Sequence, residues 1–192
     1  MVPLESEEIL MSANEYIIRY TEGYRRDLDL QIREIFFQPP ARNNFKDDQE
    51  KESFFQRWTR TYFRYYPEYI YCYMQDQKVL GYLMGCPLSS KEEEFTQNIP
   101  GYAVFAHLFR DFEAHYHINC RVEARGKGVG KKLTKRFESD LKSLSDPRIK
   151  GMHVVTAPQA ENVKFYKKIG HSFAQYGHYK DRELLFLGRP LQ

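Results

Sequence analysis

Residues 123–133 read Glu-Ala-Arg-Gly-Lys-Gly-Val-Gly-Lys-Lys-Leu, and they join a predicted strand to a predicted helix. Three glycines, Gly126, Gly128 and Gly130, alternate in this stretch. Because glycine has no Cβ, consecutive backbone N–H groups of such a loop face outward without obstruction. The N-terminus of the following helix adds partial positive charge. The segment therefore predicts a cradle for a pyrophosphate group.

Two common nucleotide-binding motifs do not fit this loop. A Walker A sequence and a dinucleotide-binding fingerprint would both need a glycine five positions after Gly126, where Lys131 stands. The pattern that fits is Arg125-x-x-Gly128-x-Gly130, placed after a strand. It resembles motif A (Q/R-x-x-G-x-G/A) of the GNAT superfamily of acyl-CoA-dependent N-acetyltransferases.

A second stretch, Asn162-Val-Lys-Phe-Tyr-Lys-Lys-Ile-Gly-His171, resembles the other signature of that superfamily, N-x-x-FYxKxGF. The order of strand, loop, helix, strand and short helix agrees, and the resemblance covers residues 114–175. The sequence departs from the family in that Gln159 stands where an Asn often precedes the tyrosine, and His171 replaces the usual aromatic residue. Since glutamine carries the same amide, we expect Gln159 or Asn162 to bind the cofactor.

The strand before the loop adds a narrower resemblance. Ala114-His-Tyr-His-Ile-Asn119 is similar to the His-Leu-His-Ile-Asp strand of bacterial GNAT proteins related to the acetyltransferase-like domain of O-GlcNAc hydrolases. That subgroup has an acidic residue at the last position, whereas this chain has Asn119. The difference argues against an acid–base role there.

The resemblance implies acetyl-CoA as cosubstrate, with no metal, and a set of residues that hold it. Backbone groups of residues 118–120 would pair with the pantetheine arm, and amides of residues 126–131 would hold the pyrophosphate. The cofactor-binding residues expected in this way are Ile118, Asn119, Cys120, Arg125, Gly126, Lys127, Gly128, Val129, Gly130, Lys131, Gln159, Asn162 and Tyr166.

Tyr166 matches the family's general acid, which would protonate the leaving thiolate; the alternative is a tyrosine that only packs in this tyrosine-rich chain. No carboxylate base is evident. His115 and His117 lie two residues apart, so they share one face of their strand, and we expect one to be a hydrogen-bonded core histidine. Either is a candidate for proton transfer or substrate orientation. Cys120 is not expected to act as a nucleophile, since direct attack by an amine needs no acyl-enzyme.

Hydrophobic periodicity places further elements around this core. Strand patterns occur at 16–20, 69–74, 79–85, 114–122, 152–156 and 184–187, and helical patterns at 23–37, from Asp47 or Asp48 to Pro67, and at 128–144 and 160–169, with a mixed, partly helical stretch at 88–110. This order predicts an α/β (α+β) fold, one sheet with helices on its faces. With the resemblance, we expect a single GNAT-like domain over residues 1–192 with a mixed, mostly antiparallel sheet of six to seven strands. Residues 114–175 would form the cofactor-binding core, and residues 12–112 would shape the acceptor cleft.

Composition limits the other functions. The chain has 192 residues, 42% of them hydrophobic and 16% aromatic, which is globular and excludes disorder. Its net charge of +3 does not by itself argue for nucleic acid. Segment 54–66 combines aromatic and basic residues, as a nucleic-acid-binding surface would, but it is better explained as a helix whose aromatic residues face the core and whose arginines face water. Three dispersed cysteines and residues 1–8, which lack a signal-peptide pattern, favour a cytoplasmic protein without a membrane segment.

The resemblance therefore predicts an acetyl-CoA-dependent N-acetyltransferase. The acceptor would be the amine of a small molecule or of a protein or peptide, attacking directly in a ternary complex. We expect a monomer or homodimer that binds neither nucleic acid nor membrane. The alternative function is a catalytically silent acyl-CoA-binding module, as suggested by the missing carboxylate base and by Asn119.

Overall fold

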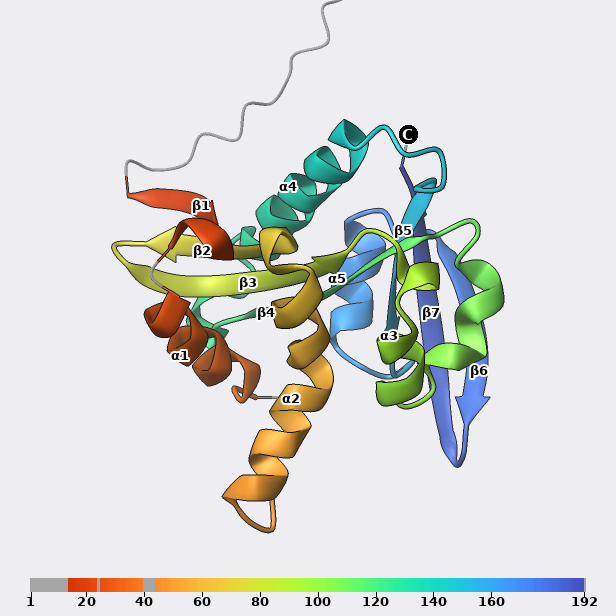
Figure 1. The fold of residues 1–192 in the computed structure, drawn as a ribbon, viewed down its shortest axis with the longest axis horizontal. Coiled ribbons are helices and arrows are strands. Elements are labelled where there is room, and N and C mark those ends of the chain that lie inside the picture. The colour runs from red at the N-terminus through yellow and green to blue at the C-terminus, as the bar shows by residue number, and fades with distance from the viewer. Residues whose placement is uncertain (1–13, 24, 40–43, 192) are drawn as a thin grey trace, which may run out of the picture.

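A computed structural model describes residues 14–23, 25–39 and 44–191 of the chain. The expectation about residues 1–8 lies outside these residues, as does Pro40, which with Pro39 is expected to end the helix of residues 23–37. The helices and strands follow one another as shown in Figure 1: β1 (Glu15–Arg19), η1 (Tyr20–Glu22), α1 (Arg25–Phe36), α2 (Asp48–Tyr65), η2 (Pro67–Tyr69), β2 (Ile70–Gln75), β3 (Lys78–Cys86), η3 (Ser89–Lys91), α3 (Glu93–Asn98), η4 (Tyr102–Leu108), β4 (Ala114–Cys120), η5 (Val122–Ala124), α4 (Val129–Ser143), β5 (Gly151–Thr156), α5 (Asn162–Lys168), β6 (Phe173–Tyr179) and β7 (Arg182–Pro190).

The seven strands form one sheet in the order β1-β2-β3-β4-β5-β7-β6. Every neighbouring pair is antiparallel except β4 and β5, so the predicted mixed, mostly antiparallel sheet is confirmed. The periodicity missed β6, whose segment Phe173-Ala-Gln-Tyr-Gly-His-Tyr179 alternates half-buried and exposed residues at the sheet edge. An edge strand of this kind contains too few apolar residues to give a clear hydrophobic periodicity.

The parallel pair β4 and β5 is joined over a very short length. Only Ala114 with Met152 and His115 with His153 are in register, although β4 continues to Cys120 and β5 to Thr156. The two strands therefore part in the middle of the sheet. The edge of β4 that faces β5 is left without a strand partner beyond His115, and this gap positions the site described below.

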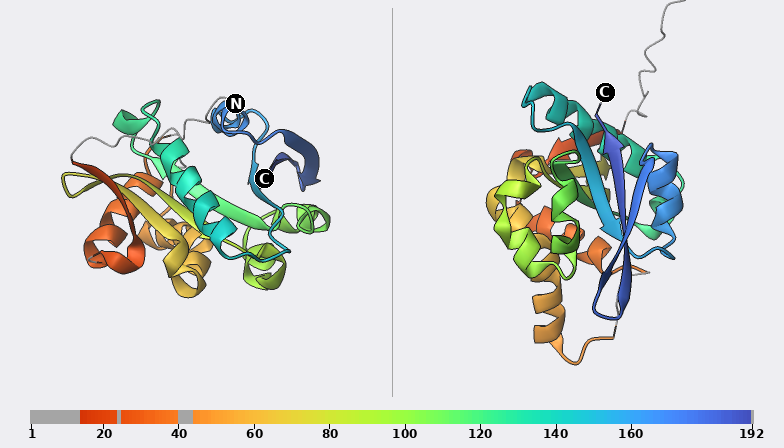
Figure 2. Two further views of the ribbon diagram at one scale, coloured as in Figure 1. Left: turned by 90° about the horizontal axis from the view of Figure 1, so that it is seen from above. Right: turned by 90° about the vertical axis from the view of Figure 1, so that its right-hand side faces the viewer.

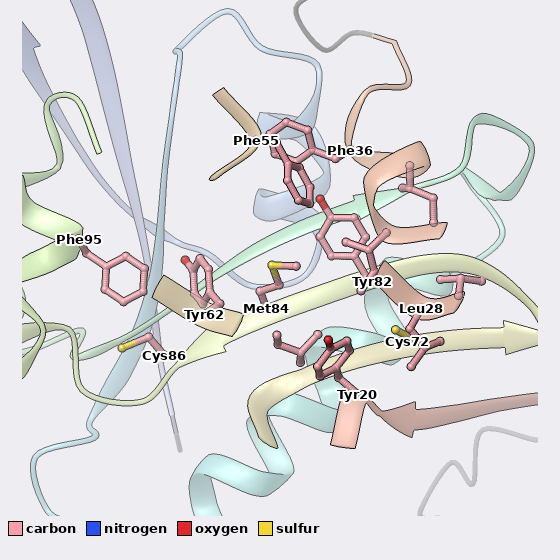
Figure 3. Packing of buried hydrophobic residues seen from close by; sticks show 14 of the residues in the cluster. Tyr20, Leu28, Phe36, Phe55, Tyr62, Cys72, Tyr82, Met84, Cys86 and Phe95 are labelled. Carbon is pink, nitrogen blue, oxygen red and sulfur yellow. The ribbon is translucent and has the colours of Figure 1, made fainter. Parts of the chain in front are cut away.

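Helices cover both faces of the sheet, each over its own apolar cluster. Helices α1, α2 and α3 lie on one face, and α4 and α5 on the other (Figure 2). Figure 3 shows the first cluster, in which Phe36 of α1, Phe55 and Tyr62 of α2 and Phe95 of α3 pack over β2 and β3. The stripe expected in residues 54–66 is confirmed, because its apolar side chains join this cluster while Arg57, Arg60 and Arg64 are exposed.

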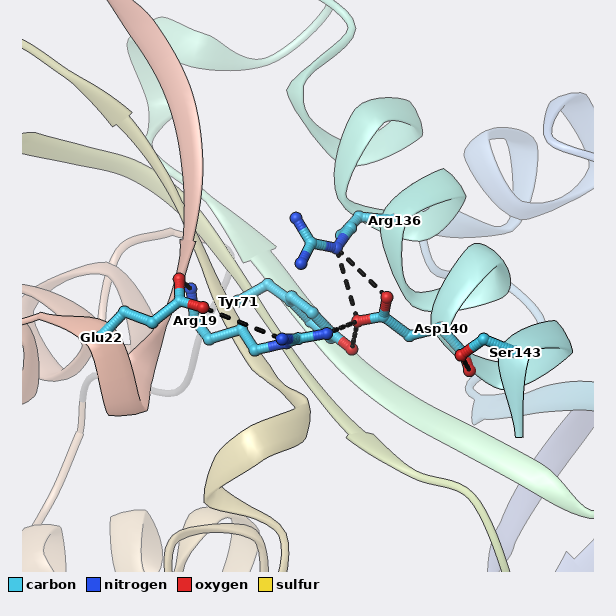
Figure 4. A network of polar contacts seen from close by, with 6 residues as sticks. All are labelled: Arg19, Glu22, Tyr71, Arg136, Asp140 and Ser143. Atoms are coloured by element: carbon cyan, nitrogen blue, oxygen red, sulfur yellow. Dashed lines mark hydrogen bonds and ion pairs between the residues drawn. The ribbon is translucent and has the colours of Figure 1, made fainter.

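A polar network ties β1 and β2 to α4 on the other face (Figure 4). The carboxylate of Asp140 accepts hydrogen bonds from the Tyr71 hydroxyl at 2.6 Å and from Arg19 Nη2 at 2.9 Å. Arg136 lies one helical turn away, with Nε 3.4 Å from the same carboxylate. Burial raises the pKa of Asp140, but the bonds from Tyr71 and Arg19 and the charges of the two guanidinium groups outweigh it, so the pKa lies below its ordinary value.

Replacing Asp140 with alanine should lower the free energy of unfolding by about 1–3 kcal/mol, because the Tyr71 hydroxyl and Arg19 lose their shared acceptor. Urea unfolding measures this change, and the exposed Glu183→Ala on β7 serves as the control. The loss should begin to shrink below about pH 4, where Asp140 of the unfolded chain becomes protonated, and it should be smallest once the pH has fallen past the lower pKa of the folded carboxylate. An equal loss of unfolding free energy in both variants would show that the network does not stabilise the fold.

Candidate active site

A cleft of about 390 Å³ opens where β4 and β5 part. It reaches both faces of the sheet: Tyr116 and Tyr166 line it on the side of α4 and α5, and His115 and His117 on the other. Aromatic side chains from α1, α2 and η4 close the latter side, namely Phe36, Phe54, Trp58, Tyr62 and Tyr102. The gap between the strands therefore connects two compartments with different walls.

The glycine loop lies beside this cleft and fits an anionic group. Gly126 and Gly128 have φ of 76° and 84°, conformations that glycine adopts without strain, and a Cβ on either would meet no atom within 4 Å. Gly128 caps α4, a helix of 15 residues, and no side chain caps its N-terminus. Since the first amides of a helix lack intrahelical partners, they are available to an anion in the open space before the loop.

Gly130 has a different role from the other two glycines. A Cβ at this position would come within 2.8 Å of the Phe165 ring and 3.6 Å of Ile118 Cδ1. Gly130 thus lets α4 approach α5 and β4 closely. It places the helix N-terminus next to Ile118, one of the residues that line the cleft.

The remaining predicted cofactor residues divide into those that reach the cleft and those that do not. Ile118, Asn119 and Asn162 line it, and Thr156 Oγ1 donates to Asn162 Oδ1 at 3.1 Å. Gln159 is exposed and is not part of the lining. The lysines at 127 and 131 are exposed beside the loop, Val129 is buried under it, and Cys120 is a half-buried free thiol.

Arg125 forms hydrogen bonds within the fold. Its guanidinium donates to the Pro39 carbonyl through Nη2 and to the Cys120 carbonyl, 3.4 Å away, through Nε. These bonds tie the loop to the end of α1 and to β4. In the described structure the side chain therefore braces the loop, and of the loop amides that of Lys127 donates to the Ala124 carbonyl at 3.4 Å.

Tyr166 stands on α5 with its ring buried against Tyr116, at 6.2 Å between ring centroids. Within the described residues its hydroxyl forms no hydrogen bond, although the residue lines the cleft. Burial, with the nearby Cys120, raises the pKa of Tyr166 well above its ordinary value of 10. The phenol is consequently protonated throughout the accessible pH range.

His117 has its Nε2 engaged. The Tyr82 hydroxyl is 3.0 Å away and Asn119 Nδ2 is 3.2 Å away, while Asn119 Nδ2 also donates to the Tyr82 oxygen at 3.0 Å. Because Tyr82 accepts from Asn119, its own proton is directed at His117. Burial lowers the pKa of His117 to about 4, so it is a neutral acceptor that already has its proton donor.

His115 differs from His117 in having one nitrogen without a partner. Its Nδ1 lies 2.6 Å from Ser89 Oγ, and its buried Nε2 has no hydrogen-bond partner among the described residues. Burial, with the neighbouring His153 and His117, holds the pKa of His115 well below its ordinary value of 6.5. His115 is thus a neutral imidazole at the cleft wall.

Ser89 is a residue that the sequence did not mark. It lies in the stretch 88–110, which has no recognised motif. Cys86 is in register with His115, so the chain leaving β3 carries Ser89 over the imidazole three residues later. That contact depends on long-range strand pairing, and no local pattern announces it.

Residues 29–171 match the family described as the Acetyltransferase (GNAT) family. No curated protein matches the chain in sequence. No group of three or more His, Cys, Asp or Glu side chains suited to a metal ion occurs among the described residues, and within them every helix is too short or too polar to span a bilayer.

Several solved structures share the fold at low identity. The crystal structure of SsHAT has a TM-score of 0.68 and 14% identity, covering 93% of this chain and 99% of its own. Chaetomium thermophilum Naa20, solved with a bisubstrate analogue, has a TM-score of 0.59 and 17% identity, covering 92% and 86%. The protein yncA from Salmonella typhimurium, solved with its cofactor acetyl-CoA, has a TM-score of 0.51 and 14% identity, covering 93% and 95%.

Proposed function

This chain belongs to the GNAT acetyltransferase family, and we propose that it transfers the acetyl group of acetyl-CoA to the amine of a small molecule or peptide by direct attack. The observation that carries the proposal is the cleft between β4 and β5. It joins the side that holds Tyr166 to the side that holds His115 and His117. A thioester and an amine can therefore meet in the gap from opposite faces of the sheet.

The residues that hold acetyl-CoA are the loop and the open edge of β4. Amides of residues 126–131 bind the pyrophosphate at the N-terminus of α4. Beyond His115 the edge of β4 has no strand partner among the described residues. The backbone groups of Ile118 and Cys120, which point away from β3, pair there with the pantetheine arm as an added strand would, and Asn119 between them bonds toward β3. Asn162 contributes its amide from the far wall of the cleft. When bound, acetyl-CoA supplies an activated acetyl thioester.

Two protons move in the reaction. A C–N bond forms and a C–S bond breaks, so the amine loses one proton and the departing thiolate gains one. His115, whose Nε2 has no partner among the described residues, accepts the first, since the Nε2 of His117 is occupied by Tyr82, and the hydroxyl of Tyr166 donates the second. A buried phenol is a weaker acid than an exposed one. Burial in the same cleft also raises the pKa of the leaving thiol, so the pKa values of the proton donor and of the thiol rise together.

The test is release of free thiol from acetyl-CoA with a panel of primary amines, together with mass spectrometry of the N-acetyl product. We expect equal amounts of thiol and product for at least one amine, and reactions without amine measure hydrolysis. Stabilisation of the protein by acetyl-CoA without turnover on any amine would instead identify a silent acyl-CoA-binding module.

A further inference from the structure

We propose, on the basis of the proposed function, that the acceptor is a small monoamine with an uncharged, apolar body and an oxygen near the amine. Trp58 Nε1–H would donate to that oxygen, and His115 Nε2 would accept from the amine. The clearest model compound for this class is phenylalaninamide. The proposal rests on the walls of the cleft and on two buried polar atoms that have no hydrogen-bond partner among the described residues.

The walls of the cleft carry no fixed charge. None of the described residues that line it is Asp, Glu, Lys or Arg, and most are aromatic or aliphatic. A second ammonium or guanidinium group on the acceptor would lose its hydration there without meeting a carboxylate. Burying an unpaired charge costs far more than one hydrogen bond returns. Polyamines and lysine-rich peptides are therefore poor acceptors for this cleft.

Trp58 supplies a hydrogen-bond donor that the fold does not use. It lines the cleft from α2, and its ring centroid lies 6.4 Å from that of His117. Its Nε1 is buried and has no partner among the described residues. Buried indole N–H groups usually have a partner, so an oxygen of the acceptor is the natural candidate.

His115 supplies a hydrogen-bond acceptor, and the contacts of Ser89 determine which nitrogen it is. Ser89 Oγ lies 2.5 Å from the Glu113 carbonyl oxygen, which has no proton, so the serine hydroxyl donates there. The 2.6 Å contact between Ser89 Oγ and His115 Nδ1 then requires a proton on Nδ1. In a neutral imidazole this leaves Nε2 bare. His115 is 3% exposed, and this unprotonated nitrogen is the one that has no partner in the described part of the chain.

The proton assignment agrees with the neighbouring groups. His153 Nδ1 lies 2.6 Å from the Phe112 carbonyl and therefore donates to it, so His153 Nε2 accepts from the Tyr102 hydroxyl at 2.7 Å. Tyr102 consequently has no proton left for Ser89, 3.4 Å away. Ser89 is a positioning residue, because it holds His115 in the tautomer that presents Nε2 to an amine.

The experiment compares four primary amines by kcat/KM, calculated on the concentration of neutral amine. Phenylalaninamide has the aromatic body and a carbonyl oxygen, phenethylamine lacks the oxygen, phenylalanine adds a carboxylate, and spermidine adds cations. We expect phenylalaninamide to exceed phenethylamine by about 2- to 13-fold, the effect of one neutral hydrogen bond. Phenylalanine and spermidine should be the poorest of the four.

Two variants separate the roles of the unpartnered atoms. Trp58→Phe keeps an aromatic ring and removes the N–H. The ratio of kcat/KM for phenylalaninamide to that for phenethylamine should therefore fall to about 1. Tyr65→Phe, which removes an exposed hydroxyl from the same helix, should retain that preference. Ser89→Ala should lower kcat for both amines by about 10-fold without changing the KM for acetyl-CoA. The Ser89 backbone N–H still donates to the Glu113 carbonyl at 3.1 Å, which keeps the local fold.

Failure of this proposal differs from failure of the proposed function. Spermidine as the best acceptor, or an unchanged preference in Trp58→Phe, would overturn the proposed acceptor class while acetyl transfer stands. An unchanged kcat in Ser89→Ala would overturn the positioning role. Absence of turnover with all amines, with acetyl-CoA still bound, would instead contradict the transferase function itself.

Discussion

Replacing Tyr166 with phenylalanine is expected to lower kcat by about 10²–10⁴-fold while the affinity for acetyl-CoA changes little. The substitution keeps the ring that packs against Tyr116 and removes only the hydroxyl, which forms no hydrogen bond to another described residue. If that hydroxyl donates its proton to the departing thiolate, its loss affects the chemical step and leaves binding intact. Steady-state kinetics and thermal shift with acetyl-CoA measure the two effects separately.

The pH profile and a control variant sharpen this result. Because the pKa of Tyr166 lies well above 10, the phenol should add no falling limb to the rate below pH 10. Tyr69→Phe removes a hydroxyl in the same apolar cluster but outside the cleft, so it should keep kcat within about twofold. Full kcat in Tyr166→Phe, under conditions where chemistry limits the rate, would return Tyr166 to a packing role.

Replacing Gly128 with valine is expected to abolish stabilisation of the protein by CoA. In the wild type, ligand at 100 times its Kd should add about 2.7 kcal/mol, or roughly 5–10 °C in Tm for a chain of this size. At Gly128, φ is 84° and the space ahead of a Cβ is open. A β-branched residue resists that conformation and would project into the space that the pyrophosphate needs.

The control for Gly128→Val is a substitution at another glycine with positive φ. Gly170 has φ of 101°, and a Cβ there would meet the end of the Arg189 side chain at 3.3 Å. Gly170→Ala should therefore lower Tm through backbone strain while the shift caused by CoA persists. Gly130→Val is unsuitable, since its Cβ would displace Phe165 on the helix that carries Tyr166. An undiminished rise in Tm with CoA in Gly128→Val would show that the loop does not bind the cofactor.

Most of the fold could be predicted because its signals are local. Periodicity marks the strands and helices from residue 16 to 187, and the elements occur in the expected order. The exception, β6, is an edge strand whose alternation is weak and includes Gly177. Its pairing with β7 comes from register over seven residue pairs, which stabilises a strand that its composition alone does not announce.

In the candidate site, the glycine loop and the tyrosine of α5 could be predicted from the sequence, because both belong to short local motifs. The sequence also placed His115 and His117 on one face of a strand, since side chains alternate in a strand. It did not distinguish the two histidines. That distinction depends on which partner each imidazole meets.

The partners of the two imidazoles come from long-range contacts in the fold. Pairing of β3 with β4 brings Ser89 to His115 and Tyr82 to His117. Within the described residues, Nε2 of His115 is left without a partner, whereas Nε2 of His117 is occupied. The parting of β4 and β5 opens the cleft, and packing of α2 on the sheet brings Trp58 to its wall. Contacts between residues distant in the sequence set the protonation and exposure of each group, so no local pattern contains them.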